Sequence, residues 1–126
     1  MSDITVNIKQ TFKEQDMKDL LCIAFEGGSN YWYFIEEFGN PDKIECEYQH
    51  IDLPFSENGY LMIKDQEDDS DEPELYRLDR KAIEKGLPIM AEKCPWHFDN
   101  FVKDNADAET GDVYLQCCLF GDIVYG

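Results

Sequence analysis

The chain has 126 residues, 43% of them hydrophobic and 13% aromatic, so it is long enough for one domain with a real core and is not composed like a disordered chain. Its 28 acidic and 11 basic residues give a net charge of −17, which disfavours direct binding to nucleic acid or anionic membranes and favours a cationic partner. No apolar run has the length of a membrane span and no apolar signal segment is present, so we expect neither secretion nor membrane insertion.

The cysteines form an odd and scattered set: Cys22, Cys46, Cys94, Cys117 and Cys118. Several of them have apolar neighbours. Buried free thiols in a reducing cytosol are the expected state.

The spacing of apolar residues changes between the first two predicted elements of the chain. Residues 3–10 alternate between apolar and polar side chains, which predicts a strand. From about Lys13 the apolar residues recur at helical spacing, and this predicts a helix. Gly27 or Gly28 is expected to end that helix in the left-handed conformation.

The middle of the chain predicts strands separated by turns. Strands are expected over 31–35, where a short helical turn is the alternative, and over 44–48 and 60–63, with a turn over 39–42. Seven of the ten residues from Asp65 to Glu74 are acidic, so this segment is predicted to be a flexible loop. The return strand of a long hairpin is predicted over 75–78.

The last part of the chain is predicted to form helices. Asp79 is a suitable N-cap for a helix that runs to Cys94, and Pro88 either kinks this helix or starts a second segment. A short helix over 96–103, a polar link over 105–111 and an apolar helix over 113–119 follow. Gly121 is expected to end the last helix before a strand-like tail.

These elements predict an α+β fold: an antiparallel sheet of three to five strands with about three helices packed on one face. We expect residues 1–126 to form a single domain with a flexible acidic loop over 65–74. The first and last helices both run into glycine and then into aromatic residues. This similarity predicts that the two helices lie side by side and that the segments after them meet.

The chain carries two distinctive blocks, EGGSNYW at residues 26–32 and LFGDIVYG at residues 119–126. These blocks resemble a family of small acidic proteins carried by bacteriophages and prophages, and residues 82–87, 90–92 and 110–113 are similar to that family too. The family has no assigned activity. The resemblance therefore implies a phage origin and action in the cytoplasm of an infected bacterium, and it transfers no catalytic residue.

No catalytic, metal or cofactor site is predicted. Cys94 and His97 could bind zinc together with Cys46 and His50, but their spacing matches no established zinc motif. The acidic loop lacks the ligand spacing of an EF-hand. Gly27 follows a helix C-terminus, where the dipole repels phosphate.

Two surfaces are candidates for binding. The first is the aromatic segment Ser29, Asn30, Tyr31 and Trp32, together with Tyr125, which is expected either to line a pocket or to be core. The second is the acidic segment, whose candidate residues are Asp65, Glu67, Asp68, Asp69, Asp71 and Glu72.

The favoured function is a non-enzymatic modulator that docks its acidic surface on a host or defence protein with a basic surface, in the manner of a DNA mimic. The first alternative is a protein that binds or sequesters a nucleotide signal in the aromatic segment. The second alternative is a structural or assembly protein of the virion. The sequence does not indicate an oligomeric state.

Overall fold

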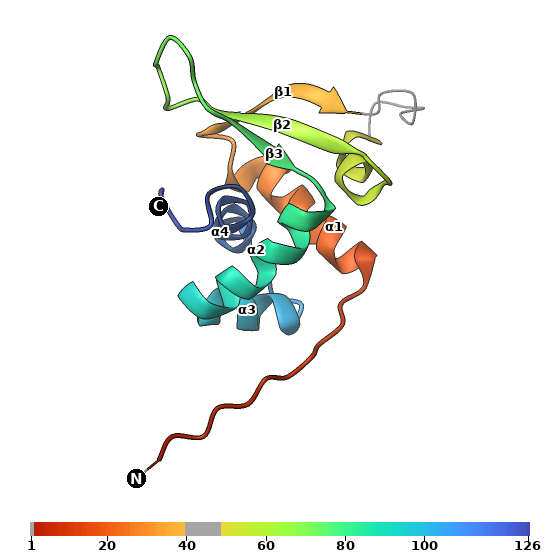
Figure 1. The fold of residues 1–126 in the computed structure, drawn as a ribbon, viewed down its shortest axis with the longest axis vertical. Coiled ribbons are helices and arrows are strands. Elements are labelled where there is room, and N and C mark those ends of the chain that lie inside the picture. The colour runs from red at the N-terminus through yellow and green to blue at the C-terminus, as the bar shows by residue number, and fades with distance from the viewer. Residues whose placement is uncertain (1, 40–48) are drawn as a thin grey trace.

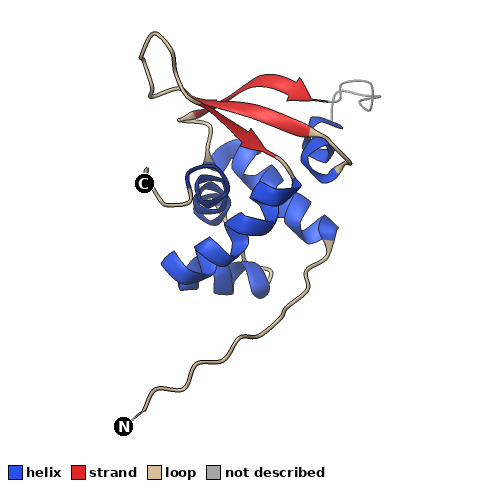
Figure 2. Cartoon of the chain, viewed as in Figure 1, coloured by secondary structure: helices blue, strands red, loops and turns tan. Residues whose placement is uncertain are grey.

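The computed structural model of the chain describes residues 2–39 and 49–126. Within these ranges the fold is α+β, with a three-stranded antiparallel sheet and the helices gathered on one side of it (Figures 1 and 2). The strands follow the order β1-β2-β3, and they are β1 (Tyr33–Gly39), β2 (Tyr60–Asp65) and β3 (Leu75–Leu78). The α-helices are α1 (Glu14–Ile23), α2 (Arg80–Lys93), α3 (Pro95–Val102) and α4 (Ala108–Phe120). A π-helical turn over Ala24–Gly28 continues α1, and a 3-10 helix spans Gln49–Phe55. No helix in the described ranges has both the length and the apolar character needed to cross a bilayer.

Helix α4 is the centre of the fold. Nine of its 13 residues, Thr110 to Cys118, are buried, because α1, α2, α3 and β3 all pack against it. A helix that is apolar on nearly all sides has to be enclosed in this way. The first and last helices therefore do pack together, as the sequence predicted.

The hairpin of β2 and β3 is confirmed, and so are the ends of two helices. Leu61 pairs with Leu78 across the hairpin and both are fully buried, so this face of the sheet covers the helices. The Asp79 side chain accepts a hydrogen bond from the backbone N–H of Ala82 and caps α2. Gly121 ends α4 with φ +70°, a conformation that glycine adopts without steric cost.

The predicted strand over residues 3–10 is wrong. This segment is extended, but it pairs with no described strand and leads away from the rest of the protein (Figure 1). Its apolar side chains remain in solvent, with Ile4 89% and Ile8 82% exposed. Alternation describes an extended backbone, but a strand also needs a partner, and no local pattern supplies one.

The predicted left-handed stop at Gly27 or Gly28 is also wrong. Neither glycine has a positive φ, and the helix instead widens into the π-helical turn that ends at Gly28. Gly28 is needed for close packing, because a Cβ atom there would lie 2.2 Å from the carbonyl oxygen of Ala108 in α4.

Several boundaries differ from those predicted. Strand β1 starts at Tyr33, because the residues before it form a turn. A single helix passes through Pro88, so no second segment begins there. Helix α4 begins at Ala108, within the predicted polar link, because Asp107 caps it by accepting from the Thr110 backbone N–H.

The tail after Gly121 is not a strand. The side-chain oxygen of Gln116 accepts the backbone N–H groups of Val124 and Tyr125, so a side chain satisfies the donors that a strand partner would bind. The predicted strand over 44–48 and most of the turn over 39–42 lie outside the described residues.

Candidate functional site

Three side chains from one turn converge on the carboxylate of Asp112. Ser29 Oγ donates to Asp112 Oδ1 at 2.8 Å, and the Trp32 indole N–H donates to the same oxygen at 2.7 Å. The Tyr31 hydroxyl donates to the other oxygen, Oδ2, at 2.6 Å. Three of the residues predicted as a binding segment are therefore joined at a buried acid that the sequence reasoning did not single out.

The turn that supplies these donors is held by its own backbone. The N–H groups of Trp32 and Tyr33 both donate to the carbonyl oxygen of Ser29, at 3.0 and 3.1 Å. Gly28 brings this turn against the first turn of α4, where a Cβ atom would also lie 3.2 Å from the backbone nitrogen of Asp112. The close approach lets the short Ser29 side chain reach the carboxylate.

Asp112 is buried without a counter-ion. It is only 6% exposed, and no ion pair joins it to a lysine, arginine or histidine in the part of the chain that the structure describes. Neutral hydrogen-bond donors stabilise a buried carboxylate, and here they replace a cation. Burial, and then the hydrogen bond to Asp112, raise the pKa of the Tyr31 hydroxyl.

The C-terminal tail completes the aromatic cluster that surrounds this acid. The ring centroid of Trp32 lies 5.1 Å from that of Phe120 and 6.0 Å from that of Tyr125, and Tyr31 lies 6.2 Å from Tyr125. These separations are typical of interacting aromatic rings. The two segments that follow the first and last helices therefore meet in space, as the sequence predicted.

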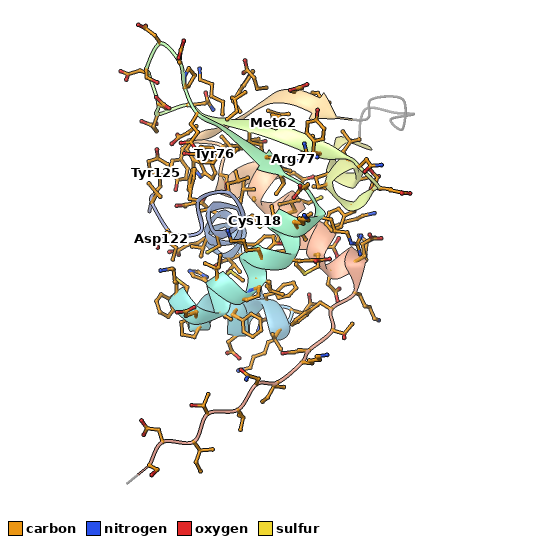
Figure 3. All side chains as sticks on the ribbon, viewed as in Figure 1. Met62, Tyr76, Arg77, Cys118, Asp122 and Tyr125 are labelled. Carbon is orange, nitrogen blue, oxygen red and sulfur yellow. The ribbon has the colours of Figure 1, made fainter. Side chains whose placement is uncertain are left out.

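The acidic hairpin loop is attached to the same cluster at its base. The Tyr125 hydroxyl donates to the Asp65 carboxylate, and this hydrogen bond raises the pKa of Tyr125 to about 12. The Gln66 backbone N–H donates to the carbonyl oxygen of Trp32 at 2.6 Å. The side-chain amide of Gln66 donates to the carbonyl oxygen of Tyr33, also at 2.6 Å. Figure 3 shows Tyr125 beside this end of the sheet, near Tyr76 of β3.

The outer part of the hairpin loop is organised by Asp68. Its carboxylate accepts from the backbone N–H and the hydroxyl of Ser70 and from the backbone N–H of Glu74. The hydrogen bonds from Ser70 lower the pKa of this aspartate, so it stays ionised. The loop therefore has internal hydrogen bonds that its composition did not predict.

The other carboxylates of the loop face solvent and lack cations. Glu67, Asp69, Asp71 and Glu72 are exposed. Within residues 2–39 and 49–126, no ion pair joins any acid of the loop to a basic side chain. The loop projects beyond the sheet (Figure 3). The result is a protruding and unneutralised anionic surface.

A cavity of about 180 Å³ lies next to Asp112. It lies between α3, the first turns of α4 and the C-terminal tail, and its lining includes His97, Glu109, Asp112 and Tyr125. His97 is 5% exposed, and its Nδ1 atom lies 3.0 Å from the Thr110 hydroxyl oxygen. Acidic, histidine and aromatic side chains therefore line the same cavity.

The structure divides the predicted aromatic segment between core and surface. Ser29 and Trp32 are fully buried, Tyr31 is half exposed and Asn30 is exposed. The segment does not line the cavity, to which only Tyr125 of the predicted group contributes. One signal could have revealed Asp112, because it is the only charged residue between Gly111 and Phe120, where most residues are apolar.

The structure does not bring together metal ligands in the described ranges, where no group of three histidine, cysteine or acidic side chains has suitable geometry. Cys46 and the side chain of His50, which the zinc hypothesis needs, lie outside the described part of the chain. Cys22, which was expected to be buried, is only partly buried, whereas Cys117 is a buried free thiol, as predicted, and burial raises its pKa to about 12. Such a thiol is unreactive at neutral pH.

Comparison of the chain with protein-family models, with curated proteins and with solved structures found no match.

Proposed function

We propose that this chain is a non-enzymatic, phage-encoded accessory protein that acts in the cytoplasm of an infected bacterium. Its acidic surface binds a basic surface of a host or defence protein. The observation that carries the proposal is the anionic hairpin loop, which is hydrogen-bonded to the core at Asp65 and Gln66 and presents carboxylates that form no ion pair with any described residue.

The physical argument is electrostatic. Unpaired carboxylates on a protruding loop attract a basic surface and steer its approach. Attachment at the base limits the conformational freedom that binding would have to remove, and this favours affinity. A partner that normally binds DNA offers such a surface, so carboxylates in the places of phosphates would compete with DNA.

The alternative of a nucleotide-binding pocket receives less support from the geometry. Ser29 and Trp32 donate their hydrogen bonds to Asp112 and are fully buried. An anionic ligand near this centre would be repelled by the buried carboxylate.

A pair of matched variants tests the proposal. The first replaces four exposed acids of the loop, Glu67→Gln, Asp69→Asn, Asp71→Asn and Glu72→Gln, and leaves Asp65 and Asp68 in place. The control replaces four exposed acids elsewhere, Asp3→Asn, Glu26→Gln, Glu92→Gln and Asp104→Asn. Both variants change the net charge from −17 to −13, because −17 + 4 = −13.

Each protein is used to capture binding proteins from a bacterial lysate, at low and high salt and with competing duplex DNA. We expect a partner that the native protein and the control retain, that the loop variant loses, and that salt and DNA release. Capture that survives neutralisation of the loop, or that salt does not weaken, would contradict the proposal.

A further inference from the structure

The cavity beside Asp112 has the size of a small organic ligand. Its volume of about 180 Å³ is roughly six times the 30 Å³ that a water molecule occupies in the liquid. Among the described residues neither a lysine nor an arginine lines it, whereas Glu109 and Asp112 both do. The cavity is therefore accessible and has a negative potential.

The two carboxylates differ in position. The Glu109 side chain is 71% exposed and lies at the rim, while Asp112 is buried and has no counter-ion among the described residues. A cation inside the cavity would interact with Asp112 through a protein interior that screens charge less than water does. An anion would be repelled from the same place.

His97 contributes a hydrogen-bond acceptor to the cavity. The Thr110 hydroxyl donates its single proton to Asp107 at 2.9 Å, so the Nδ1 atom of His97 must donate to that hydroxyl oxygen. In this Nδ1–H tautomer the Nε2 atom is an acceptor.

This Nε2 atom faces the cavity. Glu109 Oε1 lies 3.7 Å from it, which is too long for a hydrogen bond. Glu109 lines the cavity and Thr110 does not, so the Nε2 edge is the one turned towards the space. No fully buried side-chain nitrogen or oxygen atom of the described residues lacks a partner, so the Nε2 atom is accessible from the cavity, where a ligand can supply a donor.

Two aromatic side chains also line the cavity. Trp96 is 61% exposed at the edge of the cavity, which is unusual for so large an apolar side chain, and Tyr125 closes another side. Aromatic faces attract cations, and tryptophan does so most strongly.

We propose that this cavity binds a protonated primary amine. The ammonium group donates to the Nε2 atom of His97 and is attracted by Glu109 and Asp112, and its alkyl chain packs against Trp96 and Tyr125. This site is separate from the acidic hairpin loop, so it stands whether or not the loop binds a basic protein.

Nuclear magnetic resonance provides a direct test, because the chain has only two tryptophans, Trp32 and Trp96, and hence two indole N–H signals. The intact protein is titrated with n-butylammonium chloride at constant ionic strength. Parallel titrations use n-butanol, which lacks the charge, and sodium butyrate, which reverses it. We expect a saturable shift of the Trp96 signal with the amine alone.

Two variants assign the shift to the cavity. Glu109→Gln, at an exposed position that does not threaten folding, should weaken amine binding by about fivefold or more, because a charged hydrogen-bond acceptor at the rim is lost. Glu92→Gln, on the exposed surface of α2, should leave it unchanged. Shifts of equal size with n-butanol, shifts that do not saturate, or equal affinity in Glu109→Gln would overturn the proposal.

The source of the amine is resolved by a last titration with N-acetyl-lysine N-methylamide. Saturation by this compound as well as by n-butylammonium assigns the site to a lysine side chain of a peptide. Saturation by n-butylammonium alone assigns it to a free small amine.

Discussion

The indole N–H of Trp32 donates to the carboxylate of Asp112 at 2.7 Å, although the two residues are 80 positions apart in the chain. Trp32 is fully buried, so this hydrogen bond fixes the largest side chain of the core to the central helix. The same carboxylate also accepts from Ser29 and Tyr31. One acid therefore joins the turn before β1 to α4, where the C-terminal tail and the cavity also lie.

Replacement of this acid should destabilise the protein strongly. Asp112→Ala removes the acceptor of two fully buried donors, Ser29 and Trp32, and of the half-exposed Tyr31. A buried donor left without a partner costs about 1–3 kcal/mol, so we expect a loss of about 3 kcal/mol in the free energy of unfolding. Urea unfolding followed by circular dichroism measures this quantity.

The matched control for this variant is Glu92→Ala on the exposed surface of α2. A surface substitution of this kind should change the free energy of unfolding by no more than about 0.5 kcal/mol. Equal stability of Asp112→Ala and Glu92→Ala would show that the three hydrogen bonds contribute nothing.

Local patterns in the sequence were sufficient for much of the fold. Helical periodicity located α1 and α2, and the acidic run between two apolar strands located the β2–β3 hairpin. The capping role of Asp79 and the left-handed Gly121 follow from the chemistry of single residues. These features depend on neighbours in the chain, so one sequence reveals them.

The features that the sequence did not reveal depend on distant partners. Nothing near Asp112 in the chain shows that its hydrogen-bond donors lie about 80 residues earlier. The need for glycine at Gly28 arises from contact with Ala108 in another helix. The exposed state of residues 3–10 has the same cause, since periodicity indicates an extended backbone but not its pairing.

Deletion of residues 2–7 should leave the stability of the protein unchanged. The apolar side chains of this segment, Ile4 and Val6, are 89% and 68% exposed, so little burial is lost with them. We expect the free energy of unfolding to change by no more than about 0.5 kcal/mol, as for other surface changes. A clear loss of stability in the truncated protein would indicate that the segment pairs with the sheet after all.

The hydrogen bond between Tyr125 and Asp65 should give the protein a pH-dependent stability. The ordinary pKa of a tyrosine is 10.0, and the folded state raises that of Tyr125 to about 12. The unfolded chain therefore loses this proton at a lower pH than the folded chain does. The contribution of the bond is complete below pH 10 and is lost as the pH rises towards 12.

Tyr125→Phe provides the comparison for this prediction, because it removes the hydroxyl and keeps the ring. The native protein should be more stable than the variant below pH 10, and the difference should shrink as the pH rises above that value. Urea midpoints measured from pH 9 to pH 11.5 give the difference directly. A stability gap that stays constant over this range would argue against the shifted ionisation.

The two neighbouring glycines at the end of the first helix should respond in opposite ways to alanine. A Cβ atom at Gly28 would lie 2.2 Å from the carbonyl oxygen of Ala108, and nothing lies within 4 Å of one at Gly27. Neither residue has a positive φ, so backbone conformation does not oppose either substitution. Gly28→Ala should therefore cost about 1–3 kcal/mol, the usual penalty of overpacking. Gly27→Ala should be neutral or should stabilise by up to about 1 kcal/mol, because alanine favours helix more than glycine does. Thermal unfolding of the two variants side by side measures the contrast, and similar melting temperatures would mean that the turn before Ser29 does not approach α4 as closely as described.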